Sequence, residues 1–236
     1  MTVERGIAER IPDEPESAVA RALASRGARS VEWAGGGVVV AADVELVAGF
    51  GKPPPDSSVA LEAALDGAAG AEVHVPGSEP ADWFDAIGAE DLGVRALLLT
   101  RSPGAPPLRE PAHETVALTG PGDALLDSLP RALRQELRAL RPFPPAFGAL
   151  AGGALVSVAY AFLRSERHTD VSIDTVPAFR RSGFGRAAAT ALVASEEAAG
   201  RTVLWGARET NRASLALAAV LGFEHVGTLH LGALRP

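Results

Sequence analysis

The chain lacks cysteine and has no long apolar run, and each shortage excludes a class of protein. Without cysteine there can be no disulfide, no thiolate catalysis and no cysteine-ligated zinc, and such a composition suits a reducing cytoplasmic location. The longest weakly polar stretch, residues 148–163, is interrupted by Ser157, whereas a membrane helix needs about 20 apolar residues. The first residues carry charges of both signs, unlike a secretory signal. We therefore expect a protein that is soluble and has no membrane partner.

Aromatic residues and positive charge are also scarce. Aromatics make up 5% of the 236 residues, so alanine, valine and leucine must fill most core positions. The net charge of −7 lacks the basic excess that a general nucleic-acid binder normally shows. The length suits one large domain or two small ones. These properties predict a globular protein without a nucleic-acid partner.

The first part of the chain, residues 1–122, has the pattern of an α/β domain. Helices are expected at residues 14–25, 57–68 and 81–87, and strands at 35–40, 44–50, 72–75 and 94–100, with a turn at 41–43. Residues 102–122 are dense in proline and glycine, with room for a strand at 115–118. We read this stretch as the seam between two domains, 1–122 and 123–236.

The second part alternates more clearly between the two periodicities. Helices are expected at residues 124–140, 184–199 and 212–221, and strands at 154–163, 170–176, 202–205 and 223–231. Gly200 and Gly222 stand where helix-ending glycines are common. From residue 154 onward the predicted order is strand–strand–helix–strand–helix–strand.

A glycine-containing loop follows the strand that ends at Val176. Three arginines surround its two glycines: Arg180, Arg181, Gly183, Gly185 and Arg186. A helix then begins, and its first turn leaves backbone N–H groups without partners at the positive end of the helix dipole. Glycine lets the backbone approach a phosphate closely, and arginine adds charge and hydrogen-bond donors. The loop therefore predicts a pyrophosphate site, although solvated arginines around a simple turn would give the same pattern.

Two other nucleotide motifs fit less well. The spacing of Gly183, Gly185 and Ala188 matches the dinucleotide fingerprint G-x-G-x-x-A, but six residues separate the strand from the first glycine. No acidic residue ends a following strand about 20 residues on, as that motif requires. A Walker loop is absent because Gly51-Lys52 is followed by proline. A nicotinamide-dependent enzyme stays a distant alternative.

A second motif lies downstream of the loop, and the two motifs together are more specific than either one alone. Asn211-Arg212-Ala213-Ser214 and then Leu221-Gly222-Phe223 follow the loop in order. Together with Arg180-x-x-Gly183-x-Gly185, they resemble the GNAT superfamily of acetyl-coenzyme A-dependent N-acetyltransferases, over residues 123–236. The resemblance implies an α/β (α+β) fold with a mixed, mostly antiparallel sheet flanked by helices. Tandem arrangements occur in that superfamily, and the first half has features of a degenerate copy.

The resemblance also assigns roles to residues. It implies that acetyl-coenzyme A (acetyl-CoA) is the co-substrate and that its pantetheine arm lies along the strand before the loop. The residues implied in cofactor binding are Thr175, Val176, Arg180, Arg181, Ser182, Gly183, Phe184, Gly185, Arg186, Asn211 and Ser214. Asn211 also stands where an ordinary helix N-cap would stand, and the two roles can coexist.

Attack of a neutral amine on a thioester needs a base for the amine proton and usually an acid for the thiolate. Asp170 and Asp174 share one strand face with Ser172 by period-two alternation, so both are candidate bases. A purely structural role, in which these carboxylates bond to neighbouring backbone groups or to an arginine, would give the same sequence pattern. Many family members have a tyrosine that acts as the general acid at the position where this chain has Ala218. The proton must then come from water, Ser214 or another group, or the chain binds coenzyme A without catalysis.

The resemblance implies acetyl transfer to a primary amine on a small molecule, by an acyltransferase for groups other than aminoacyl groups. The acceptor pocket would lie at the seam between the halves. The alternative is a non-catalytic coenzyme A-binding or sensor protein. The histidines show no metal-ligand spacing, so no metal is expected. His168 could reach the acceptor side as a base, but we expect a solvated loop residue. The sequence leaves open whether the chain forms a homodimer.

Overall fold

The computed structural model describes residues 7–41, 45–54, 59–77, 80–101, 105–140 and 142–235. The helices are α1 (Ile7–Arg10), α2 (Ala18–Ser25), α3 (Val59–Leu65), α4 (Pro80–Ile87), α5 (Arg131–Ala139), α6 (Phe184–Ala198) and α7 (Arg212–Val220), with 3-10 helices η2 (Ala124–Ser128) and η3 (Pro177–Phe179). The strands are β1 (Arg29–Trp33), β2 (Gly36–Ala41), β3 (Leu46–Gly51), β4 (Glu72–Pro76), β5 (Ala89–Thr100), β6 (Thr115–Ala117), β7 (Ala146–Ala151), β8 (Ala154–Arg164), β9 (His168–Thr175), β10 (Thr202–Arg208) and β11 (Glu224–Leu234).

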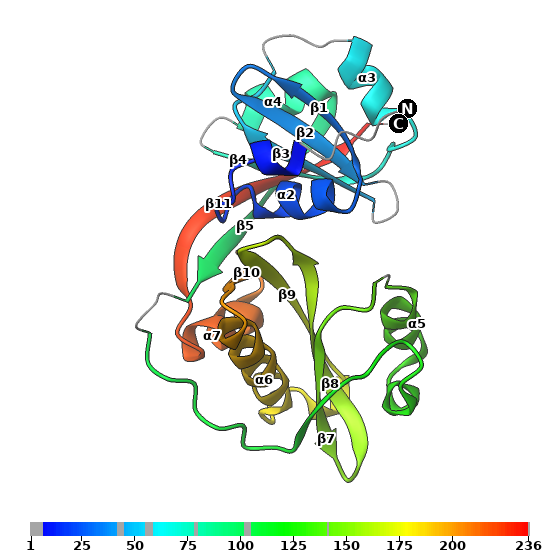
Figure 1. Ribbon diagram of the computed structural model, residues 1–236, viewed down its shortest axis with the longest axis vertical. Coiled ribbons are helices and arrows are strands. Elements are labelled where there is room, and N and C mark those ends of the chain that lie inside the picture. Colours follow the sequence, from blue (N-terminus) through cyan, green and yellow to red (C-terminus); the bar gives the residue numbers. More distant parts are fainter. Residues whose placement is uncertain are drawn as a thin grey trace.

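All these strands join one eleven-stranded sheet in the order β1-β2-β3-β4-β11-β5-β10-β9-β8-β7-β6 (Figure 1). Its pairs are antiparallel except β3 with β4 and β9 with β10, which are parallel. Helices cover both faces. This is the mixed, mostly antiparallel α/β architecture that the sequence predicted.

The two halves of the chain exchange their last strands. β5, from the first half, lies between β10 and β11, whereas β11, from the second half, lies between β4 and β5. The two long strands pair with each other from Glu224↔Thr100 to Leu234↔Ala89, and both run between the halves in Figure 1. The sheet is therefore continuous across the predicted domain boundary.

Each half has the same local order of elements. The first half runs β3-α3-β4-α4-β5 and the second runs β9-α6-β10-α7-β11. In each, the parallel pair is joined for three residues only, ending at Ala48↔His74 and at Asp170↔Leu204. Beyond those pairs the strands continue without a shared register, so each half contains one point where two parallel strands diverge.

Alternation along the strands divides the core between the two faces. In β2, Val38 and Val40 pack with α3 and α4, whereas Val39 and Ala41 pack with α2 on the opposite face. In the second half, α6 and α7 lie on the face of α3 and α4, and η2 and α5 lie on the face of α2. The buried alanines of α6, residues 187–189, are part of the alanine-rich core that the composition required.

Most predicted elements are confirmed with shifted ends. The turn at residues 41–43 and the start of the helix at 57 lie partly outside the described residues. The single helix predicted at 124–140 is wrong, because Pro130 lacks an N–H and holds Leu129 extended (φ −79°, ψ 154°), which splits the segment into η2 and α5. The sequence analysis missed β1 and β7. In the described part of the chain, no helix is both long and apolar enough to span a bilayer.

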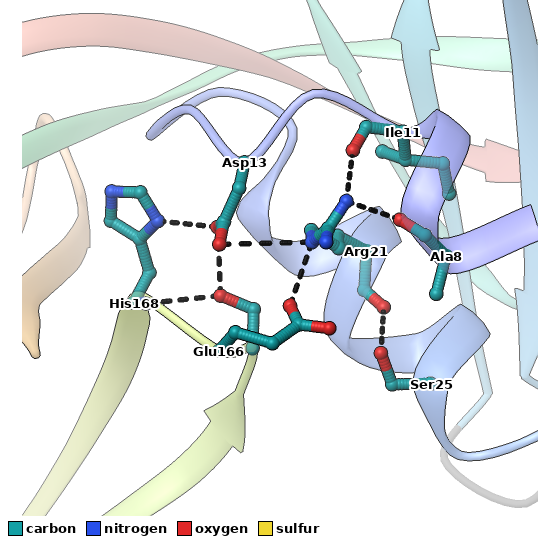
Figure 2. A network of polar contacts seen from close by, with 8 residues as sticks. Ala8, Ile11, Asp13, Arg21, Ser25, Glu166 and His168 are labelled. Atoms are coloured by element: carbon teal, nitrogen blue, oxygen red, sulfur yellow. Dashed lines mark hydrogen bonds and ion pairs between the residues drawn. The ribbon is translucent and has the colours of Figure 1, made fainter.

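A polar network joins the N-terminal segment to the turn between β8 and β9 (Figure 2). His168 Nδ1 donates to Asp13 Oδ1 at 2.6 Å, and Ser165 Oγ donates to the same oxygen at 2.8 Å. Arg21 Nε lies 2.8 Å from Glu166 Oε2, and its guanidinium also donates to the carbonyls of Ala8 and Ile11. His168 is only 6% exposed, so the expectation of a solvated loop histidine is wrong.

Candidate functional site

A cavity of about 760 Å³ opens where β9 and β10 diverge. Its walls come from β9, the loop after β9, β10 and the start of α7. The lining residues are Ile173, Asp174, Thr175, Arg180, Arg181, Gly183, Gly185, Arg186, Trp205, Asn211, Ala213, Ser214 and Leu217. The fold thus brings the glycine loop and the Asn211 motif, residues 211–214, into one site.

The loop before α6 presents free backbone donors. Gly183 is the N-cap of α6, with φ 89°, and no side chain caps this end. The first amide of the helix to bond back is that of Ala187, which donates to Gly183 O. The preceding amides of the first turn therefore have no intrahelical partner and can bind an anion. Arg181 has φ 60°, a conformation that costs roughly 1–2 kcal/mol for a residue with a Cβ.

Close packing fixes this loop against β9. A Cβ at Gly185 would lie 3.0 Å from Thr175 Oγ1, so glycine lets the helix begin close to the strand without displacing that side chain. Ser157 Oγ lies 2.7 Å from Thr175 Oγ1 and donates to Asp174 O at 2.8 Å. Arg180 Nε donates to Thr175 O at 3.1 Å, so its side chain folds back along the loop.

A stack of three rings holds the two ends of the loop together. The rings of His113 and Phe184 stack with centroids 3.9 Å apart, and Phe179 meets Phe184 edge-on at 5.6 Å. His113 Nε2 also donates to Ser182 O at 2.7 Å. The sequence analysis missed His113, because it lies 69 residues from Ser182 in the chain and belongs to no local motif.

The Asn211 motif is a capped helix start beside the cavity. Asn211 Oδ1 accepts from Ser214 N at 3.2 Å, which is the N-cap interaction expected for this position. Ser214 Oγ accepts from Trp205 Nε1 at 2.9 Å. Because the tryptophan occupies an acceptor site of that oxygen, the hydroxyl proton of Ser214 stays available for another partner.

Asp170 lies at the point where β9 and β10 diverge. It forms the last parallel pair with Leu204, and the N–H groups of Gly206 and Val171 donate to it. Burial outweighs those bonds and raises the pKa of its carboxyl to about 7. The residue still keeps part of its surface accessible, although it is not among the residues that line the cavity.

A second acidic group faces the same side of the sheet. Burial raises the pKa of Asp174, and the nearby charge of Glu136 adds to this effect, whereas Arg180 opposes it. Tyr160 Oη donates to Glu136 Oε1 at 3.0 Å, and burial raises the pKa of Tyr160 further above its usual value. Val171 and Ile173 pack on the α6 side, so the predicted alternation of β9 is confirmed.

The remaining predicted residues lie close by but not on the cavity wall. These are Val176, Ser182 and Phe184. The Val176 N–H donates to Val156 O at 2.9 Å, so this amide is already used in the sheet. Ala218, which stands in the position of the family's tyrosine, is completely buried. Within the ranges that the structure describes, no group of three or more histidine or acidic side chains could hold a metal ion.

Comparisons with known proteins agree with the fold. Residues 146–231 match the family model described as GNAT acetyltransferase. A protein from Kribbella flavida described as a GCN5-related N-acetyltransferase is similar over 98% of this chain and 97% of its own, with 17% identity and a TM-score of 0.64. A protein from Novosphingobium aromaticivorans described as an acetyltransferase of the GNAT family is similar over 95% and 100%, with 18% identity and a TM-score of 0.62.

A tandem GNAT protein from the clavulanic acid biosynthesis pathway is similar over 85% of this chain and 79% of its own, with 15% identity and a TM-score of 0.52. At these identities the structural likeness establishes the fold. No curated protein matches the sequence of this chain.

Proposed function

We propose that this chain, whose residues 146–231 match the GNAT acetyltransferase family model, transfers an acetyl group from acetyl-CoA to a primary amine of a small molecule. The observation that carries the proposal is the single cavity that unites the loop of Arg181 and Gly183 with Asn211 and Ser214. A cysteine-free chain suits the reducing cytoplasm, where we place this activity.

The residues of the cavity fit the donor that we propose. The uncapped first turn of α6 and the guanidinium groups of Arg181 and Arg186 supply donors and positive charge for a pyrophosphate. Beyond Asp170, β9 no longer pairs with β10, so its backbone groups along Ile173 and Thr175 can bond the amides of a pantetheine arm. An extended ligand would then take the place of a missing strand partner.

The chain's own groups can handle both protons of the reaction. The amine nitrogen attacks the thioester carbonyl carbon, the C–S bond breaks, and the sulfur leaves as a thiolate. Asp170, with its pKa near 7, takes the amine proton directly or through water, and Asp174 is the second candidate. The hydroxyl of Ser214, whose oxygen already accepts from Trp205, donates a hydrogen bond to the thiolate in place of the missing tyrosine, and water supplies the proton that the sulfur finally takes.

We also propose that residues 1–122 are a degenerate copy of the fold of residues 123–236. This rests on the repeated element order and on the two diverging parallel pairs. The acceptor would reach the site from the face of Asp170, Ser172 and Asp174. On that face α2 of the first half and α5 of the second lie on either side, so the first half would form one wall of the acceptor site.

Calorimetric titration with acetyl-CoA tests the proposal. The parent should bind in the micromolar range, and Arg181→Glu and Gly183→Asp should each weaken binding at least about a hundredfold, because they place a carboxylate beside the pyrophosphate. Lys52→Glu is the matched control, since it changes the charge of the corresponding loop after β3. An unaltered affinity in both loop variants, or a loss in the control alone, would contradict the assignment.

The buried Ala218 in place of a tyrosine favours one alternative, a coenzyme A-binding or sensor protein without catalysis. Turnover with a panel of primary amines separates the two functions. Rates of about 1–10³ per second would establish an ordinary enzyme. Tight binding of acetyl-CoA with no transfer to any amine would establish the alternative.

A further inference from the structure

The segment between β5 and β6 passes α6 on its way across the second half (Figure 1). Its described part, residues 105–114, is anchored at both ends: Arg101 Nη2 donates to Pro106 O at 3.0 Å, and Leu150 N donates to Glu114 O at 3.0 Å. Between the anchors, Leu108 packs against the core under α6. His113 is therefore held in place by the fold and not merely by its own side-chain contacts.

The contact of His113 with Ser182 sets the direction of one peptide group. The carbonyl of Ser182 and the N–H of Gly183 belong to the same planar trans peptide, so they point in opposite directions. Because the carbonyl is held by His113 Nε2 at 2.7 Å, the N–H of Gly183 is turned to the other side. Gly183 lines the cavity, so we expect the histidine to fix the direction of one donor that would bind an anion there.

The loop needs such a brace because its backbone is in a conformation that a free chain seldom visits. Arg181 and Gly183, on either side of Ser182, both have positive φ values, and a flexible glycine loses much entropy when it is ordered. The imidazole also stacks flat on Phe184 at 3.9 Å. A loop ordered in advance binds its ligand more tightly because less entropy is lost on binding.

We propose that His113 is a positioning residue for the coenzyme A loop. Through the Ser182 carbonyl and the Phe184 ring, it holds the amides before α6 in the arrangement that binds a pyrophosphate. The segment that connects the two halves thereby helps to build the donor site. This inference rests on the proposed function, since it assumes that the loop binds the pyrophosphate of acetyl-CoA.

The test compares His113→Ala, His113→Gln and His113→Phe with the parent, by calorimetry with three probes. The probes are acetyl-CoA, 3′-phospho-ADP, which carries the pyrophosphate, and S-acetylpantetheine, which lacks it. We expect His113→Ala to weaken binding of the first two about tenfold, from loss of one hydrogen bond and one ring contact. Gln, which keeps a donor, and Phe, which keeps the ring, should each restore part of the affinity. Binding of S-acetylpantetheine should not change.

His225→Ala is the matched control, because His225 is an exposed histidine on β11 whose ring bonds only locally, to Thr228. Thermal unfolding of every variant excludes loss of fold as a cause. If the parent binds acetyl-CoA and His113→Ala binds it equally well, the inference is overturned while the proposed function stands. An equal loss for S-acetylpantetheine would make His113 a general structural residue, which also overturns it. A parent that does not bind acetyl-CoA overturns both.

Discussion

The loops after β3 and β9 occupy equivalent places in the sheet, yet their backbones are used in opposite ways. After β3, the amide of Lys52 donates to Gly35 O at 2.9 Å, and its carbonyl accepts from Trp33 Nε1 at 2.9 Å. After β9, no side chain caps the start of α6, and the amides of its first turn before Ala187 have no intrahelical partner. A shared topology therefore does not make a binding site. The cavity lies where the first turn of the helix leaves its amides without partners.

The gap between the diverging strands shows the same contrast. In the first half, a Cβ at Gly49 would lie 2.9 Å from the ring of Trp83, which also meets Trp33 at 5.7 Å. Side chains thus fill the space beside this strand. In the second half a cavity opens there, and Asp170 stands where the first half has Ala48. The first half fills its divergence with side chains, and the second leaves a cavity there.

Among the variants that test this comparison, Asp170→Asn should have the largest effect. It removes the carboxyl at the point where β9 and β10 diverge, so that this point is uncharged, as it is at Ala48 in the first half. If Asp170 is the base, the turnover number should fall about 10²–10⁴-fold. The parent's rate should rise with pH through about 7, as the carboxyl ionises. This rise with pH should disappear in the variant. Steady-state kinetics over a pH series measures both.

Asp174→Asn is the comparison variant for that experiment, since it removes the carboxyl of the second candidate base from the same strand face and shows which of the two acids the rate depends on. A stability measurement independently checks whether folding raises or lowers the pKa of Asp170. The pKa of Asp170 is raised on folding, so its ionisation opposes folding increasingly as pH rises from the ordinary aspartate value toward about 7. The Asn variant should therefore gain stability over the parent at pH 8 and lose that advantage near pH 4. A full rate in Asp170→Asn would transfer the role of base to another group.

Two tryptophan truncations sharpen the comparison next. Trp83 and Trp205 are each 2% exposed, but only Trp205 lines the cavity. Trp83→Ala should lower the free energy of unfolding by about 3–5 kcal/mol, a fall in melting temperature of roughly 10 °C, with no change in acetyl-CoA affinity. Trp205→Ala should lower both stability and affinity. Equal losses of affinity in the two variants would show that the first half also shapes the donor site.

Local chemistry was enough to predict the position of the glycine loop before α6 and most of the elements. Arg180-x-x-Gly183-x-Gly185 and the Asn211 motif each lie within a few residues, so their hydrogen-bonding requirements can be read directly from the sequence. Alternation in Val38–Ala41 and in Asp170–Thr175 likewise reports which face is buried. By contrast, β7 (Ala146–Ala151) has no β-branched residue and stands among prolines and glycines, so it gave no strand signal.

Contacts between distant segments could not be predicted in this way. The exchange of β5 and β11 depends on which edge each long strand pairs with, and nothing in either strand specifies the partner. His113 meets the loop of Ser182 only because the connecting segment passes α6. Asp13 and His168 are 155 residues apart in the chain. In each case the partner is chosen by the tertiary fold.

The smallest expected effect concerns the polar contact that joins the two halves. Burial alone would raise the pKa of Asp13, but hydrogen bonds from His168 and Ser165, helped by the charge of Arg21, outweigh it and lower the pKa. Asp13→Asn should therefore reduce the free energy of unfolding at pH 7 by about 1–3 kcal/mol. A lowered pKa gives stability that is present above the unfolded value of 3.8 and is lost as pH falls through the folded one. The difference between parent and variant, followed by denaturant unfolding, should shrink below pH 4.

Glu32→Gln, which breaks the more exposed pair with Arg10, should change stability by less than about 1 kcal/mol. A difference between Asp13→Asn and the parent that does not shrink at all as pH falls below 3.8 would mean that packing at Asp13, and not its charge, joins the halves.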